Sequence, residues 1–201
     1  MRKQVDKRVV DIINKVPDNY TLANEILKKI KNNSTKVKLD NDIKNSYYVF
    51  VNDTIYLASN KKANEDYSRL CLIAHECWHS IQSKLIQKIN FILSNIELVL
   101  FIICAVILLL KLNYIIIPII YTLVVLLSLL IRFVLEFGAI KNSVFVSKDY
   151  ISEKFDNTSA NLVASEFKKN IKKLLPVFIL SLSASRFCRI ALIWIIYVYI
   201  K

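Results

Sequence analysis

Glycine and proline are scarce in this chain, which has one glycine and three prolines in 201 residues. Its first residues, MRKQVDKRVVDII, are basic but lack an apolar run followed by a small-residue cleavage site, so they do not resemble a signal peptide. No internal repeat or low-complexity linker is evident. The cysteines show no paired spacing, which predicts reduced, buried thiols and a cytoplasmic or intramembrane setting. They are Cys71, Cys77, Cys104 and Cys188.

Apolar residues, by contrast, are abundant and unevenly distributed. They make up 55% of the chain, which is high for a soluble domain of this size. They concentrate in three blocks, Ile89–Leu110, Tyr114–Val134 and Leu174–Ile200. Each block is about long enough to cross a hydrocarbon layer of ~30 Å as a helix. We therefore expect a mainly α membrane protein, with a transmembrane helical hairpin over residues 89–135 and a third transmembrane helix over residues 174–201.

The net charge of +12 does not indicate a nucleic-acid-binding protein, because the lysines form no stripe with interleaved aromatic residues. Residues 1–90 carry 16 Lys and Arg against 10 Asp and Glu, and residues 137–173 carry 7 against 4. The loop between the first two apolar blocks offers only Lys111. Basic residues gather on the cytoplasmic side of a membrane, so we expect both basic regions to face the cytoplasm of a multi-pass membrane protein.

The segments outside the apolar blocks predict a small α/β cytoplasmic portion over residues 1–88. Residues 3–16 and 21–31 have helical periodicity, and a longer helix is expected over residues 64–88. Tyr47–Val51 and Thr54–Ala58 flank Asn52-Asp53 and predict a β-hairpin, whose edge could bind an extended peptide by strand addition. Residues 136–173 are expected to form a second cytoplasmic, amphipathic helical segment that ends in a basic collar before the third block.

The predicted helix over residues 64–88 contains His75-Glu76-Cys77-Trp78-His79, which includes the only two histidines of the chain. Residues four apart project from the same face of a helix, so both imidazoles can bind one metal ion. Glu76 lies about 100° further around the helix, where it can take a proton from the water that attacks a peptide carbonyl. The pattern favours a zinc (Zn²⁺) hydrolase over a chance arrangement on a core helix.

A catalytic zinc site usually has three protein ligands, so a third ligand is expected. Cys77 lies on nearly the opposite side of the helix from the histidines, where core packing is its favoured role. The first two apolar blocks carry the chain across the membrane and back, and Glu136 is the first acidic residue after that return. We therefore expect Glu136 to be the third ligand. The alternatives are an ion pair of Glu136 with Arg132, and Asp149 or Glu153 as the ligand.

Two segments around these residues resemble a known family. Ala74-His-Glu-Cys-Trp-His-Ser-Ile-Gln82 resembles the A-H-E-x-G-H-x-I-Q signature of the YugP-like membrane-bound neutral zinc metallopeptidases, and more distantly the HtpX-type membrane peptidases, which are gluzincins. Leu135-Glu-Phe-Gly-Ala139 is similar to the family's E-F-x-A segment. The resemblance covers roughly residues 40–200. It implies a zinc metalloendopeptidase with His75, His79 and Glu136 as ligands and Glu76 as general base, acting on polypeptides in or near the membrane.

Two rival functions follow from other residues. Ile140 replaces the small polar residue that follows E-F-x-A in the family, which favours a catalytically degenerate relative that acts as a binding or assembly factor. A small transporter would need polar residues along its spans, and the second block offers almost none. Glu97 in the first block and Arg186 and Arg189 in the third are charges inside predicted spans, so they are expected to pair or to handle substrate.

Overall fold

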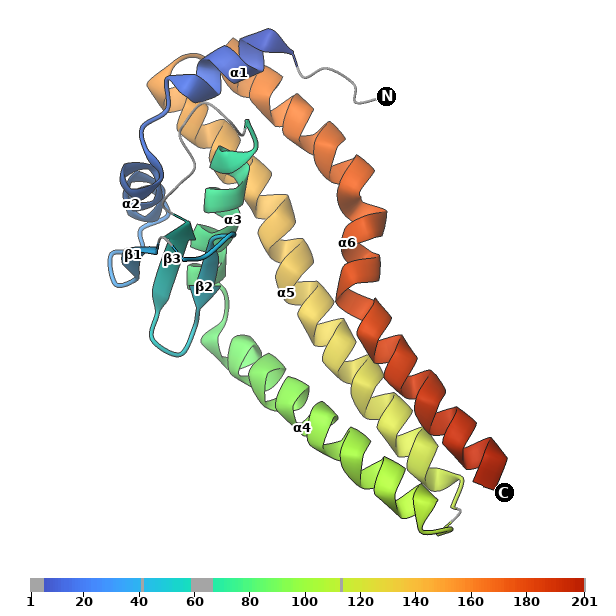
Figure 1. Cartoon of the computed structure of the whole chain (residues 1–201). Helices are drawn as coiled ribbons and strands as arrows, with labels where there is room; N and C mark the ends of the chain where they lie inside the picture. Colours follow the sequence, from blue (N-terminus) through green and yellow to red (C-terminus); the bar gives the residue numbers. More distant parts are fainter. Residues whose placement is uncertain (1–5, 41, 59–66, 113, 201) are drawn as a thin grey trace. The chain divides into compact units, whose positions relative to one another are not determined.

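The computed structural model describes residues 6–40, 42–58, 67–112 and 114–200. In these ranges the chain forms six helices and a small three-stranded mixed sheet (Figure 1). Three of the helices are long and apolar enough to cross a membrane. The expected fold class is therefore confirmed. The chain divides into two compact units, Met1–Lys84 with Glu136–Lys173 and Leu85–Leu135 with Leu174–Lys201.

The first unit begins with two short helices, each with an aspartate as its N-cap. In α1 (Lys7–Asn14) the side chain of Asp6 accepts a hydrogen bond from the backbone N–H of Arg8. In α2 (Asn19–Lys29) Asp18 accepts one from Thr21. An N-cap of this kind satisfies one of the backbone donors that the first turn of a helix leaves without a partner. Both helices were expected from periodicity, and Pro17 lies in the connection between them.

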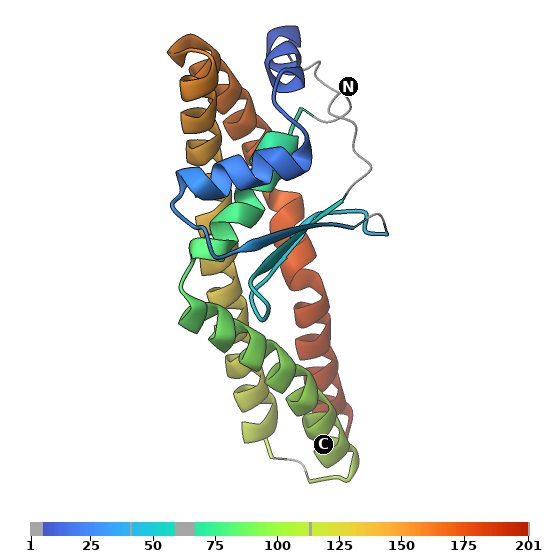
Figure 2. The same ribbon diagram turned by 90° about the vertical axis from the view of Figure 1, so that its left-hand side faces the viewer.

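The sheet of this unit has the order β1-β3-β2. β2 (Tyr47–Val49) and β3 (Thr54–Ala58) are antiparallel, so the expected hairpin is confirmed, and Asp53 in its turn has a positive φ of 47°. β1 (Lys36–Asp40) was not expected and pairs in parallel with β3. β2 is an edge strand, and Figure 2 shows the hairpin running beside α3 (Arg69–Ile81).

The single helix expected over residues 64–88 is wrong, because α3 ends at Ile81 and α4 (Lys84–Leu109) starts a separate helix. Gln82 breaks the helix with an extended conformation (φ −66°, ψ 156°). The start expected for that helix, at residue 64, lies outside the described residues. At the start of α3, the buried guanidinium group of Arg69 donates hydrogen bonds to backbone carbonyl oxygens of Val16 and Pro17, which ties α3 to the α1–α2 connection.

The core of the first unit brings α1, α2, α3 and β3 together with the last turns of α5 (Ile116–Lys154) and the first turns of α6 (Asn157–Ile200). Cys77 is fully buried there, and its sulfur lies 3.7 Å from the carbonyl oxygen of Ala23, so its expected role in the core is confirmed. Other fully buried members include Val9, Leu22, Ile26, Ile55, Leu57, Leu70 and Ile151. This core fixes α3 against α5 within the unit.

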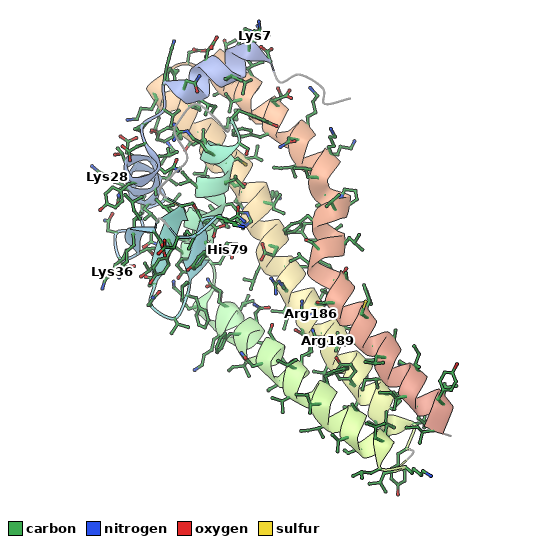
Figure 3. The ribbon with its side chains drawn as sticks, viewed as in Figure 1. Lys7, Lys28, Lys36, His79, Arg186 and Arg189 are labelled. Carbon is green, nitrogen blue, oxygen red and sulfur yellow. The ribbon has the colours of Figure 1, made fainter. Side chains whose placement is uncertain are left out.

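The second unit contains most of α4 and the apolar parts of α5 and α6. Helices α5 and α6 each connect an apolar block to the neighbouring amphipathic segment without a break, and Pro176 lies inside α6. Of the two roles expected for the charges in these blocks, pairing is observed: Glu97 Oε2 lies 2.9 Å from Arg186 Nε. Glu97 Oε1 also lies 2.6 Å from an Nη atom of Arg189. Figure 3 labels both arginines on α6.

Candidate metal centre

The two histidines of α3 face the same direction, as their spacing predicted. Their Nε2 atoms lie 3.0 Å apart, and the two rings are nearly perpendicular, with an interplanar angle of 89°. Two neutral imidazole nitrogens at this separation can bind a common metal ion. His79, labelled in Figure 3, is directed from α3 toward α5.

Glu136 of α5 lies in the same unit and meets both histidines. Its Oε2 atom is 3.5 Å from His75 Nε2 and 3.7 Å from His79 Nε2, and these are its ion pairs among the described residues. With the 3.0 Å between the two nitrogens, the three atoms form a triangle whose circumscribed circle has a radius of about 2.0 Å. Zinc–nitrogen bonds are about 2.0–2.1 Å and zinc–carboxylate bonds about 2.0–2.2 Å. The three side chains thus fit one zinc ion.

A hydrogen bond outside the triangle orients one of the histidines. His79 Nδ1 lies 2.7 Å from Gln82 Oε1, which can only accept, so Nδ1 carries the hydrogen and Nε2 keeps its lone pair. Burial lowers the pKa of His79, but its contacts with Glu136, Glu76 and Gln82 together raise that pKa above its ordinary value. Gln82 therefore holds the ring of His79 from the Nδ1 side, opposite the nitrogen that faces His75 and Glu136.

Glu76 lies beside the three metal-capable groups and is held by the sheet. Its Oε2 accepts a hydrogen bond of 2.8 Å from the backbone N–H of Tyr48 in the edge strand β2. Burial raises the pKa of Glu76 above its ordinary value, although His75, His79 and the Tyr48 N–H each act to lower it. A carboxyl group whose pKa moves toward neutrality is suited to proton transfer.

The hairpin that supplies this N–H is fixed by a polar network around Asp53. Its carboxylate accepts hydrogen bonds from Thr35 (2.9 Å) and from the hydroxyl of Tyr48 (2.7 Å), and pairs with Lys84 (2.9 Å). The Lys84 ammonium also bonds the Tyr48 hydroxyl. Burial raises the pKa of Asp53, but these three partners together lower the pKa by more than burial raises it, so the net shift is downward. Tyr48 is thus held by both its backbone and its side chain.

The other candidate ligands do not join this group. Asp149 and Glu153 both pair with Lys29 of α2. Three contributors were missed by the sequence reasoning: the backbone of Tyr48, the side chain of Gln82 and the position of Gly138. A backbone donor leaves no signal in a sequence. Gln82 and Gly138 did lie inside the quoted motifs, and Gly138 is the only glycine of the chain.

In comparisons with protein-family models, curated proteins and solved structures, no match to the chain was found.

Proposed function

We propose that this protein is a membrane-embedded zinc metallopeptidase of the YugP-like type, with His75, His79 and Glu136 as ligands and Glu76 as catalytic base. The observation that carries the proposal is the triangle of two imidazole nitrogens and one carboxylate oxygen around a point about 2.0 Å from each. It has two histidines and one carboxylate, a ligand set that catalytic zinc sites use. Glu76 follows the first ligand directly on the same helix.

Zinc held by these residues would act as a Lewis acid that polarises a peptide carbonyl and makes water more acidic. Glu76 accepts a proton from the attacking water and delivers it to the amine nitrogen as the C–N bond breaks. Two features support this role: the raised pKa of Glu76, and the Tyr48 N–H that fixes one of its oxygens at 2.8 Å. The second carboxylate oxygen, Oε1, then remains for proton transfer.

The edge strand β2 supports a substrate bound in extended form. In its pairing with β3, Tyr48 is opposite Ile55, and the Tyr48 N–H points away from β3 toward Glu76. A peptide aligned along this edge would therefore pass beside the base. Addition of a strand to an exposed edge gives affinity through main-chain hydrogen bonds, with little dependence on side chains.

The chain itself connects the site to the membrane. His79 is separated by only a few residues from α4, and Glu136 follows the apolar part of α5 within the same helix. We infer that the substrates are polypeptides of the membrane or its immediate surroundings. The excess of Lys and Arg in residues 1–90 and 137–173 supports a site on the cytoplasmic face of the cell membrane.

The test combines metal analysis with hydrolysis. The detergent-solubilised wild type should contain one zinc ion per chain and cleave casein or membrane-protein substrates. Glu76→Gln should keep the zinc and lose about 10²–10⁴-fold in rate, because an amide cannot accept the proton. His75→Ala should lose the zinc as well.

The contradicting outcomes are equally concrete. Cleavage by Glu76→Gln at the wild-type rate would remove the proposed base. A wild type that binds zinc but hydrolyses neither casein nor any protein in membranes compared between wild-type and Glu76→Gln cells would favour the binding or assembly factor instead.

A further inference from the structure

The side chain of Gln82 lies beside both His79 and Gly138, and the proposed mechanism uses neither contact. Gln82 follows the last residue of α3. Its extended backbone keeps one hydrogen bond to the helix, from the Gln82 N–H to the carbonyl oxygen of His79 (3.3 Å). This turn directs the side chain back along α3, so that Oε1 reaches His79 Nδ1 at 2.7 Å. The interruption between α3 and α4 therefore places an amide on the outer nitrogen of a metal-capable imidazole.

The orientation of this amide decides which tautomer His79 adopts. With Oε1 toward the ring, Nδ1 must carry the hydrogen, and Nε2 presents a lone pair to the point shared with His75 and Glu136. With the amide reversed, its NH₂ group would donate to Nδ1, and the hydrogen of the neutral ring would move to Nε2. That tautomer cannot bind a metal through Nε2.

Gly138 accounts for the space that the amide nitrogen occupies. It lies inside α5, two residues after Glu136, and no glycine of the described chain has a positive φ. Backbone freedom thus gives no reason for a glycine here, and in a helix interior glycine is destabilising relative to alanine. A Cβ atom added at Gly138 would lie 3.1 Å from Gln82 Nε2, which is closer than ordinary van der Waals contact. Any larger residue would press on the amide.

We propose that Gln82 is a positioning residue that holds His79 in the Nδ1–H tautomer. Gly138, because it has no side chain, leaves room beside α5 for the amide of Gln82. The purpose of this device rests on the proposed zinc site, but the tautomer itself is a property of the metal-free protein. Partners of this kind on a histidine ligand typically change metal affinity by about 10–100-fold.

The first measurement is the tautomer of His79 in the metal-free, detergent-solubilised full chain. The chain has two histidines, so ring ¹⁵N labelling gives two sets of signals, which His75→Asn assigns. The spectra are recorded at about pH 9, well above the ordinary imidazole pKa. His79 should be protonated on Nδ1 in the wild type and in Gln82→Glu, whose carboxylate also accepts, and should become a mixture in Gln82→Ala.

The second measurement is zinc affinity by competition with a chelator. Gln82→Ala should bind zinc about 10–100-fold more weakly, and Gln82→Glu should restore the affinity. Gly138→Ala should weaken binding in the wild-type background and have no further effect in the Gln82→Ala background, since it acts through the amide.

The outcomes separate this proposal from the function on which it rests. An unchanged His79 tautomer in Gln82→Ala overturns the proposal, whether or not zinc affinity falls. Additive effects of Gly138→Ala and Gln82→Ala overturn the part assigned to Gly138. A wild type that binds no zinc would overturn the proposed peptidase, while the tautomer measurement would still decide the role of Gln82.

Discussion

Shortening Glu136 by one carbon tests the metal centre most directly. In Glu136→Asp the carboxylate oxygen would withdraw by about 1.5 Å, to roughly 5 Å from the two Nε2 atoms. The circle through the three atoms then grows from a radius of about 2.0 Å to about 2.7 Å, beyond the length of a zinc–oxygen bond. Aspartate should therefore behave like alanine and leave two histidine ligands, whereas glutamine keeps the reach and should give an intermediate affinity.

The expected loss of affinity is at least the 10–100-fold that partners of a ligand contribute, which is about 1.4–2.7 kcal/mol. Chelator competition on the purified protein measures it, together with zinc stoichiometry. Glu153→Gln is the matched control, because it removes a carboxylate from the same helix where that group pairs with Lys29. It should bind zinc within about twofold of the wild type.

Unchanged zinc stoichiometry and affinity in Glu136→Ala would refute the reasoning, since the histidines would then need another partner. A loss confined to Glu153→Gln would show that the ligand lies further along α5.

Three further expectations concern the Asp53 network, the charge cluster of the second unit and the membrane topology. Asp53→Asn should lower the free energy of unfolding in detergent by about 1–2 kcal/mol at neutral pH. The lowered pKa of Asp53 means that its stabilisation is present above the unfolded pKa of about 3.9 and is lost as pH falls through the folded value, so the difference should vanish in acid. Glu97→Gln should destabilise the protein by about 3–5 kcal/mol in thermal unfolding, because Arg186 and Arg189 lose their buried carboxylate, and a smaller effect would contradict a structural role for this cluster. In a cysteine-free background, a cysteine at Lys111 should react with an impermeant maleimide on intact cells and one at Lys36 only after permeabilisation; equal labelling would refute the proposed topology.

The elements that the sequence predicted well are those whose signal is local. An apolar run of membrane length needs no partner to be recognised, and the spacing of His75 and His79 fixes their common face through helix geometry alone. The hairpin was also predictable, since β-branched and aromatic residues flank a short turn at Asn52-Asp53.

The elements that were missed depend on partners distant in sequence. β1 has charged residues at three of its five positions and exists as a strand because β3 pairs with it in parallel. The end of α3 carries neither glycine nor proline, so nothing local marks the break at Gln82. At this position the backbone of Gln82 leaves the helix, and its side chain contacts His79. Glu136 was predicted by following the chain across two expected spans and back, but its distances to the histidines come from the packing of α3 against α5.

The order in which the metal-capable residues occur along the chain has a consequence for biosynthesis. His75 and His79 precede the helical hairpin, and Glu136 follows it, fifty-seven positions after His79. At roughly 5–20 residues per second, a ribosome needs about 3–11 seconds to travel that distance. During this interval the emerging chain has two of the three metal-capable groups and cannot form the complete centre. The three metal-capable groups can therefore come together only once both helices of the hairpin have been synthesised, so the complete centre cannot precede these two apolar helices.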